Sequence, residues 1–221
     1  MFTGIIEELG WVSQIKPQGD GKEFTIQCSS SFLKLVKIGD SIAVNGACQT
    51  VTALGNQNFS FFSSKQTLEI TNLSNLTLKD RVNLEKALMM GSRLDGHLVS
   101  GHIDTVGQVW EIKKQQAGVL LEIKLPSTLL PLVIPKGSIA IDGISLTIYK
   151  IKDSIISFSV IPHTFEHTTL KFYNKGSLVN LEADFLGKYV QRALQFKDYE
   201  KQNSYSSPNL EKTLKEQGFW L

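Results

Sequence analysis

Two short segments of this chain carry the same arrangement of reactive side chains. Cys48 lies two residues before Thr50, and Ser145 lies two residues before Thr147, in segments that read SIAVNGACQTVT (41–52) and SIAIDGISLTIY (138–149). A thiol or hydroxyl at such a position can act as a nucleophile or a hydrogen-bond donor, and the threonine adds a second donor. Free cysteine is also a common small buried residue, so the pattern alone leaves a packing role for Cys48 open.

Histidines are the second group of candidates. His97 and His102 lie in the glycine-containing segment DGHLVSGH (95–102), and imidazole is the side chain best suited to move protons near neutral pH. Two solvated loop residues are the alternative interpretation. His163 and His167 have the i, i+4 spacing of helix-borne metal ligands, but no HExxH or CxxC motif accompanies them. We expect no metal site and no bound cofactor.

The two reactive segments belong to a longer repeat. Their spacing of 97 residues holds elsewhere without a gap: VNLE recurs at 82–85 and 179–182, and Gly4-Ile5-Ile6 falls opposite Gly101-His102-Ile103. A repeat of this length indicates duplication of a whole domain rather than a solenoid. We expect domains at 1–97 and 98–186 and a tail at 187–221. Two related domains can present two related pockets, which suits a reaction between two similar molecules.

The elements that position these residues are predicted to be short strands. Residues 24–28, 49–54 and 119–125 alternate between apolar and polar side chains, and turn residues punctuate them. Asn45-Gly46 and Asp142-Gly143 lie between two strand-like runs in each copy and predict tight hairpins with positive φ. The pattern indicates an all-β protein, either a closed barrel or a sandwich.

The tail has a different period. Leu186, Tyr189, Val190, Ala193 and Leu194 follow helical spacing and predict a helix with one apolar face. That face can pack on a neighbouring subunit or fold back on its own chain. A second short helix is predicted to begin at Ser207-Pro208 and to end near Gly218.

Composition excludes several classes of function. The net charge is +2, with 23 basic and 21 acidic residues and no basic stripe, so we expect no nucleic-acid partner. No stretch approaches the length of a membrane span, and two cysteines do not make a disulfide framework. We therefore expect a cytoplasmic protein with reduced thiols and no membrane partner.

Five motifs together resemble the riboflavin synthase family. They are MFTGIIE (1–7), NGACQTV (45–51), HLVSGH (97–102), IDGISLT (141–147) and IPHT (161–164) followed by TTL (168–170). The resemblance covers about residues 1–190. It implies an all-β fold of two tandem, similar six-stranded Greek-key barrels plus a C-terminal helix, assembled as a homotrimer. It also implies a cofactor-free dismutation, in which two molecules of 6,7-dimethyl-8-ribityllumazine give riboflavin and 5-amino-6-ribitylaminouracil.

The resemblance also implies the site residues. The residues implied in catalysis are His102 for proton transfer, Cys48 or Ser145 for activation at C7, Phe2 packing over the substrate ring, and Asp184. The N-terminal pocket is implied to contain Gly4, Ile5, Ile6, Cys48, Gln49, Thr50, Phe62, Ser63, Ser64, Lys65, Gln66 and Thr67. The C-terminal pocket is implied to contain Gly101, His102, Ile103, Lys136, Ser145, Leu146, Thr147, Ile161, Pro162, His163, Thr164, Phe165 and Glu166.

Two other classes compete with the enzyme. Antenna proteins of the same duplicated fold hold a lumazine or flavin without chemistry, and they would be expected to lose the second pocket. A barrel domain of a flavin reductase is the other class, but the chain has no nicotinamide-binding half.

Gln49 and Gln66 depart from the family pattern, which usually has Leu and Glu there.

Overall fold

The computed structural model describes residues 1–204, with side chains up to residue 196. Residues Met1–Phe185, which contain both copies of the repeat, form one compact unit, and the described residues from Leu186 to Ser204 belong to a second. The short helix predicted at Ser207-Pro208 lies outside the described residues.

The first copy of the repeat is a closed barrel. Its strands follow the order β1-β2-β5-β4-β3-β6, which is a Greek-key arrangement with antiparallel neighbours. The helix α1 and the 3-10 turn η1 connect β5 to β6. The elements are β1 (Glu8–Gln18), β2 (Gly21–Gln27), β3 (Ser41–Val44), β4 (Ala47–Leu54), β5 (Asn58–Ser63), α1 (Lys65–Ile70), η1 (Asn72–Asn75) and β6 (Arg81–Lys86).

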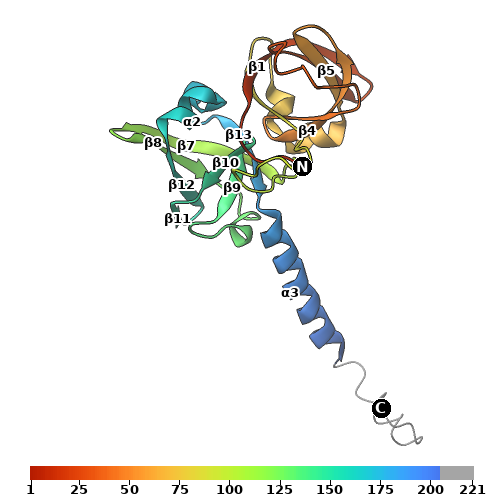
Figure 1. Ribbon diagram of the computed structural model, residues 1–221. Helices are drawn as coiled ribbons and strands as arrows, with labels where there is room; N and C mark the ends of the chain where they lie inside the picture. Colours follow the sequence, from red (N-terminus) through yellow and green to blue (C-terminus); the bar gives the residue numbers. More distant parts are fainter. Residues whose placement is uncertain (205–221) are drawn as a thin grey trace, which may run out of the picture. The chain divides into compact units, whose positions relative to one another are not determined.

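The second copy repeats this order in an open, seven-stranded sheet, β10-β9-β13-β7-β8-β12-β11, which forms a half-barrel rather than the expected closed one; we call it the second barrel, and Figure 1 shows it beside the first. Its elements are β7 (Thr105–Gln115), β8 (Gly118–Lys124), η2 (Leu130–Leu132), β9 (Ser138–Ile141), β10 (Ile144–Thr147), β11 (Lys150–Lys152), β12 (Ile155–Val160), α2 (Pro162–His167), η3 (Thr169–Phe172) and β13 (Leu178–Ala183).

The extra strand has a local cause. The equivalent of β4 is interrupted at Ile148 and Tyr149, whose amides donate to the carbonyls of Gly137 (2.9 Å) and Ser157 (2.8 Å). In the first copy, β4 carries a β-bulge at the same place, between Val51 and Ala53. Bulges bend a strand and disturb its ladder. In the second copy the bend divides the strand, so the expected six strands appear as seven.

Both predicted hairpins are confirmed. Asn45 and Asp142 have φ values of 46° and 45°, and the glycines that follow them have 77° and 79°. The two hairpin tips also meet each other: a Cβ added to Gly46 would lie 2.5 Å from the amide nitrogen of Gly143. Glycine is required at this contact for its backbone conformation and for its lack of a side chain.

Each barrel has its own apolar core, and a third small cluster joins them. The cluster contains Phe2, Ala43, Val99 and Ala140, all buried. Ala43 and Ala140 are equivalent positions of the repeat, as are Phe2 and Val99. The members therefore pack around an approximate two-fold axis between the barrels.

Buried asparagines fix the barrels to each other. Asn83 on β6 donates from Nδ2 to the carbonyl of Asp142 (2.9 Å), and Asn180 on β13 donates to the carbonyl of Asn45 (2.8 Å). Both asparagines have no exposed surface. Because unpaired buried amides are costly, these reciprocal bonds determine how the barrels meet.

The predicted tail helix is confirmed as α3 (Phe185–Ser204), which extends beyond the last apolar residue of the predicted stripe. Among the described residues, no helix is both long and apolar enough to span a bilayer.

Candidate functional site

Each strand that carries a candidate reactive residue is hydrogen-bonded to a loop that belongs to the other copy of the repeat. The amide of Cys48 donates to the carbonyl of Gly101 at 2.8 Å, and the amide of Ser145 donates to the carbonyl of Gly4 at 2.8 Å. Between these contacts, Phe2 and Val99 form a backbone bridge with N···O distances of 2.7 and 3.1 Å. The N-terminal segment therefore lies against the second barrel, and the linker lies against the first.

This exchange corrects the grouping implied by the resemblance. The resemblance implies that Gly4–Ile6 belong to the N-terminal pocket and Gly101–Ile103 to the C-terminal pocket. The structure brings Gly4 to Ser145 and Gly101 to Cys48 instead. Ile6 packs against the second core, and Ile103 is buried in the first. Equal spacing in the two copies cannot reveal which barrel each segment packs on.

The reactive side chains of the first barrel lie on the outer face of β4. Burial alternates along this strand, so Cys48 is half-buried, Thr50 is exposed, and Gln49 between them points into the barrel. The amide oxygen of Gln49 accepts a hydrogen bond from Ser63 Oγ at 2.7 Å. The side chains of Gln49 and Ser63 therefore point into the barrel, away from the face on which Cys48 and Thr50 lie.

The second barrel has the same arrangement on β10. Ser145 is half-buried and Thr147 exposed, whereas Leu146 is buried in the core. The Ser145 hydroxyl oxygen lies 2.7 Å from Nδ1 of His97, in a hydrogen bond whose direction depends on the imidazole tautomer. The sequence makes His97 a candidate for proton transfer but gives no reason to pair it with Ser145, because the two residues are 48 positions apart in the chain.

Burial lowers the pKa of His97, and the charge of Asp184 acts in the opposite direction. The neutral imidazole is therefore the favoured form at neutral pH. Asp184 directly follows β13 in the chain. His97 and Ser145 therefore form a hydrogen-bonded pair of a proton acceptor and a hydroxyl, and the charge of Asp184 acts on the imidazole.

His102 is placed differently from His97. It is exposed, it follows Gly101, and its amide donates to Ser100 Oγ at 3.2 Å. Because Gly101 is bonded to Cys48, His102 lies beside the first barrel's reactive strand rather than beside Ser145.

Phe2 does not lie where a ring-stacking role requires it. Its side chain has no exposed surface, and a Cβ on Gly101 would lie 2.8 Å from the Phe2 ring. The ring fills the seam between the barrels under the linker. Its expected packing over the substrate ring does not fit this position, and its contribution in this structure is to support the Gly101 loop.

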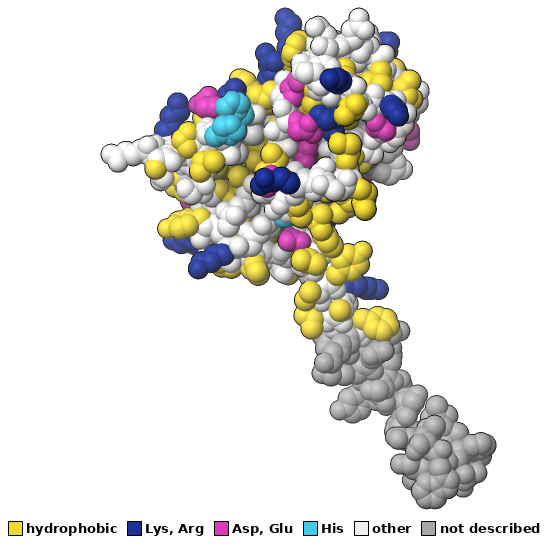
Figure 2. Space-filling model, viewed as in Figure 1, with side chains coloured by type: hydrophobic (Ala, Val, Ile, Leu, Met, Phe, Trp, Pro, Cys, Tyr) yellow, Lys and Arg dark blue, Asp and Glu magenta, His cyan; other side chains and the backbone are white. Residues whose placement is uncertain are grey.

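The remaining predicted residues lie at the ends of β5 and β12 and on the helices that follow, except Lys136, which lies in the loop before β9. Ser64 caps α1 by accepting from the Thr67 amide at 3.3 Å, and Phe62 is exposed. On α2, the rings of His163 and His167 stack with centroids 4.3 Å apart, and Figure 2 shows histidine side chains at the surface there. Half-buried members of the set are Thr67 and Thr164, and Phe165 is buried. The exposed members, besides Phe62, are Lys65, Gln66, Lys136, Ile161, Pro162, His163 and Glu166.

Neither a metal nor a reactive second thiol is indicated. Among the residues that the structure describes, no group of three or more His, Cys, Asp or Glu side chains is arranged to hold a metal ion. Cys28 is buried, and desolvation with the nearby Glu8 charge raises its pKa to about 12. Its thiol therefore stays protonated and inert.

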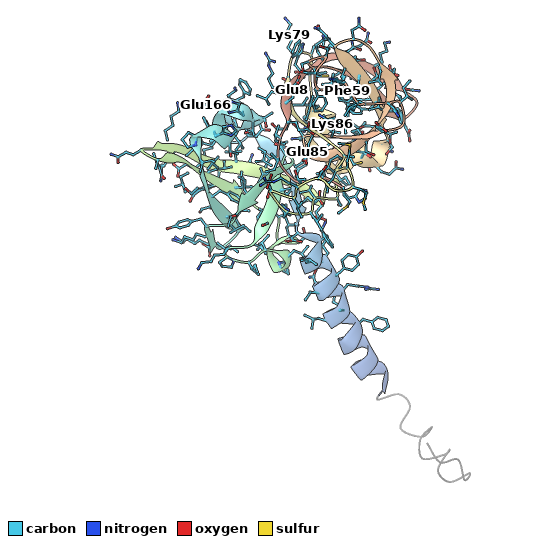
Figure 3. All side chains as sticks on the ribbon, in the orientation of Figure 1. Glu8, Phe59, Lys79, Glu85, Lys86 and Glu166 are labelled. Atoms are coloured by element: carbon cyan, nitrogen blue, oxygen red, sulfur yellow. The ribbon has the colours of Figure 1, made fainter. Side chains whose placement is uncertain are left out.

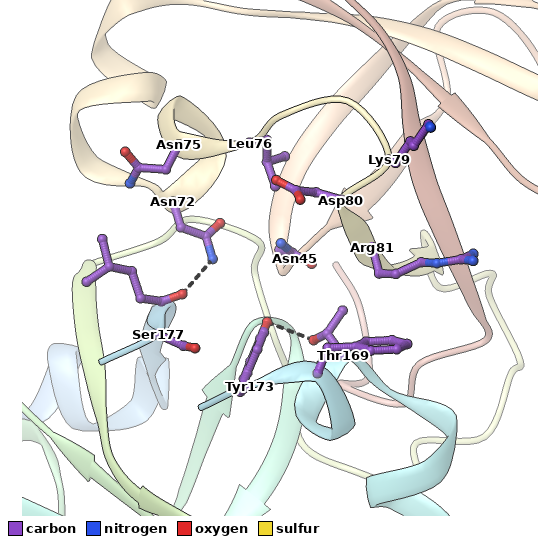
Figure 4. A pocket seen from close by; sticks show the side chains of 12 residues that line it. Asn45, Asn72, Asn75, Leu76, Lys79, Asp80, Arg81, Thr169, Tyr173 and Ser177 are labelled. Atoms are coloured by element: carbon purple, nitrogen blue, oxygen red, sulfur yellow. Dashed lines mark hydrogen bonds between the residues drawn. The ribbon is translucent and has the colours of Figure 1, made fainter. Parts of the chain in front are cut away.

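A groove of about 450 Å³ lies between the barrels, and none of the predicted site residues lines it (Figure 4). Asn72 and Tyr173 line it and contact the buried carboxyl group of Asp142, which accepts from Asn72 Nδ2 at 2.8 Å and from the Tyr173 hydroxyl at 2.5 Å. Burial raises the pKa of Asp142 to about 7, against the effect of these hydrogen bonds. The equivalent residue of the first copy is the uncharged Asn45.

Comparisons with known proteins agree with the duplication. The family model described as "Lumazine binding domain" matches residues 3–87 and again residues 100–184. The chain is 41% identical to the riboflavin synthase of Bacillus subtilis (strain 168) over 194 residues, covering 88% of this chain and 90% of that one. It is 42% identical to the riboflavin synthase of Actinobacillus pleuropneumoniae over 219 residues, covering 99% and 100%.

Solved structures of the same fold include LumP complexed with riboflavin. The TM-score is 0.78 at 29% identity, covering 83% of this chain and 99% of LumP. A second LumP structure, complexed with 6,7-dimethyl-8-(1′-D-ribityl) lumazine, has a TM-score of 0.76 at 27% identity, with 83% and 99% covered.

The two copies of the lumazine-binding domain, each folded into a barrel-like sheet, define a tandem lumazine-binding protein. Within that class, the identity of about 40% over nearly the whole chain decides the family. The chain belongs to the riboflavin synthases.

Proposed function

We propose that this chain converts two molecules of 6,7-dimethyl-8-ribityllumazine into riboflavin and 5-amino-6-ribitylaminouracil, with one substrate bound by each barrel. One lumazine gives a four-carbon unit to the other. The atoms of the two substrates equal those of the two products, so no oxidant, reductant or cofactor is consumed.

The observation that carries this proposal is the presence of two equivalent, outward-facing reactive strands. Cys48 and Thr50 lie on one, and Ser145 and Thr147 lie on the other. Binding two lumazines in such sites would make a bimolecular reaction effectively intramolecular, and good orientation can contribute about 7–11 kcal/mol to lowering the barrier.

The first chemical step requires an acidic C7 methyl group and stabilisation of its anion. Hydroxyl and amide donors near the lumazine ring oxygens would favour that anion. His102, on the first barrel's side, is proposed to transfer protons. Ser145, supported by His97, is proposed to act at C7 of the other substrate, with Asp184 nearby as the carboxylate that favours the imidazolium form.

The competing function is that of an antenna protein that only binds its ligand. The likeness to LumP supports binding of a lumazine or flavin, but its identity of 29% is well below the 42% shared with a riboflavin synthase. The chain also retains Cys48, His102, Ser145 and Thr147 together. These features favour the enzyme.

Assembly, location and domain limits are finer parts of the proposal. We propose a homotrimer held by the tail helix α3, because the spacing of Leu186, Val190 and Leu194 gives this helix an apolar stripe. We propose lumazine-binding domains at 1–97 and 98–186, with the first six or so residues of each exchanged between barrels. The free thiols of Cys28 and Cys48 support a cytoplasmic location.

Incubation of the purified protein with 6,7-dimethyl-8-ribityllumazine alone tests the function. Chromatography should show riboflavin forming without any added cofactor. Saturable binding with a change in fluorescence, but no riboflavin, would identify an antenna protein instead.

A further inference from the structure

Two buried carboxylates hold the exchanged loops. Oε1 of Glu85 accepts from the amide and the hydroxyl of Thr3 at 2.5 and 2.7 Å, and Oε2 accepts from the Gly4 amide at 3.0 Å. Glu182 makes the same three bonds to Ser100 and Gly101, at 2.7, 2.7 and 3.0 Å. The two glutamates are 3% and 2% exposed. Figure 3 labels Glu85 in the first barrel.

Each loop reaches from one barrel's glutamate to the other barrel's reactive strand. Glu182 belongs to β13, but the Gly101 that it holds accepts from the amide of Cys48 on β4. Glu85 belongs to β6, but the Gly4 that it holds accepts from the amide of Ser145 on β10. In both cases, therefore, the glutamate belongs to one barrel and the reactive residue that its loop contacts belongs to the other.

The close fit of these loops makes the route rigid. Gly101 has φ +83°, and a Cβ there would lie 2.6 Å from Cys48 Cβ; Gly4 has φ +78°, and its Cβ would lie 2.6 Å from Ser145 Cβ. Neither loop can shift toward its strand. A change in how a glutamate holds its loop would therefore be transmitted to the reactive residue.

We propose that Glu182 is a positioning residue for the Cys48 site and that Glu85 is a positioning residue for the Ser145 site, each acting on the opposite barrel through its loop. The inference rests on the proposed function only in its consequence for turnover. The positioning itself can be measured without any lumazine.

A carboxylate suits this task better than an amide. Each glutamate accepts three hydrogen bonds and donates none, so both of its oxygens are used as acceptors. Glutamine would keep one oxygen and place an NH₂ group against the Gly4 or Gly101 amide, leaving two donors facing each other. The Glu→Gln change keeps the size of the side chain and alters only this contact.

The test uses the rate at which iodoacetamide modifies Cys48 in the folded protein. Cys48 is half-buried, and the other thiol, Cys28, is buried and inert, so the native rate reports on Cys48; Cys48→Ala confirms this. A lost hydrogen bond of about 1.4 kcal/mol corresponds to a tenfold change in the modification rate. We therefore expect Glu182→Gln to change the rate by about tenfold and Glu85→Gln by less than about twofold.

Glu85→Gln is a stringent control because Glu85, unlike Glu182, lies near Cys48 within the same sheet. Glu85 pairs with Ala43, and Ala43 pairs with Cys48. A merely local effect of the substitutions would give the larger change in Glu85→Gln. That result, equal changes in both variants, or no change in either would overturn the proposal.

A second pair of variants decides the question if a buried glutamine prevents folding. Ser100→Ala removes one donor to Glu182, and Thr3→Ala removes one donor to Glu85, without altering either carboxylate. Only Ser100→Ala should change the Cys48 rate, and a change confined to Thr3→Ala would contradict the crossed arrangement. With lumazine, both Glu→Gln variants should lower kcat/KM by about tenfold, the equivalent of 1.4 kcal/mol. If Glu182→Gln alone changes the Cys48 modification rate but the unmodified protein shows no turnover, the proposed function is contradicted and the positioning role is supported.

Discussion

Nδ1 of His97 lies 2.7 Å from the hydroxyl oxygen of Ser145, although the two residues are 48 positions apart in the chain. The linker places them together because His97 also donates its amide to the Thr3 carbonyl at 3.1 Å, beside the Gly4 loop that holds Ser145. The second barrel therefore has a hydroxyl paired with an imidazole at the place where the first barrel has Cys48.

His97→Ala is predicted to lower kcat by about 100-fold, the lower range for loss of a general acid or base. The double variant His97→Ala/Ser145→Ala should be no slower than the slower single variant, because the two side chains act as one unit. Steady-state kinetics on the three proteins checks this. Multiplying effects would show that the two residues act independently.

The same pair predicts a pH profile. Burial lowers the pKa of His97 from its usual 6.5, so the neutral form persists below that pH. If the neutral imidazole assists Ser145, kcat should decline on the acid side only below about 6.5. The decline should disappear from the residual activity of His97→Ala, and an unchanged acid limb in that variant would assign the titration to another group.

His102→Ala is predicted to lose most turnover, by about 100-fold, while ligand affinity changes only a few-fold. The reason is that His102 is exposed at the first barrel's reactive strand and supports no core. Rapid-mixing turnover and fluorescence titration with lumazine separate the two quantities. Activity near that of the unmodified protein would remove His102 from the proton-transfer role.

Much of the fold could be predicted from the sequence because it depends on local signals. Asn45-Gly46 and Asp142-Gly143 specify positive φ, and the 97-residue spacing relates every strand of one copy to the other. The interruption at Ile148 could not be predicted, because a β-bulge depends on how neighbouring strands curve rather than on residue type.

The site was less predictable for a different reason. The sequence shows that Gly4 and Gly101 are equivalent, but it cannot tell whether each packs on its own barrel or on the other. Two equivalent folds offer two equivalent surfaces, and only the three-dimensional path of the linker selects one. The burial of Phe2 and the partner of His97 follow from that same exchange.

Gly101→Ala is predicted to destabilise the fold by several kcal/mol, because its φ is positive and its Cβ would lie 2.6 Å from Cys48 Cβ. Gly19→Ala is the matched control, since Gly19 has φ +62° and nothing within 4 Å of an added Cβ. Its cost should be limited to about 1–2 kcal/mol of backbone strain. Chemical denaturation of both variants measures the difference, and equal losses would show that the Gly101–Cys48 contact is not restrictive.

Asp142→Asn is predicted to remove a pH dependence of stability. The pKa of Asp142 is raised to about 7 in the folded protein from its usual 3.8, so the folded state binds the proton more tightly. Stability from this group is therefore present below pH 3.8 and is lost as the pH rises towards 7. Denaturation midpoints between pH 4 and 8 should fall less steeply in Asp142→Asn, whereas parallel curves would show that Asp142 does not titrate in this window.

The stoichiometry of turnover tests the central claim most directly. Purified protein should be incubated with 6,7-dimethyl-8-ribityllumazine alone, and the three compounds should be quantified by chromatography over time. The two-site account predicts that two lumazines disappear for each riboflavin and each 5-amino-6-ribitylaminouracil formed. Riboflavin without an equal amount of the uracil, or no turnover despite tight binding, would contradict it.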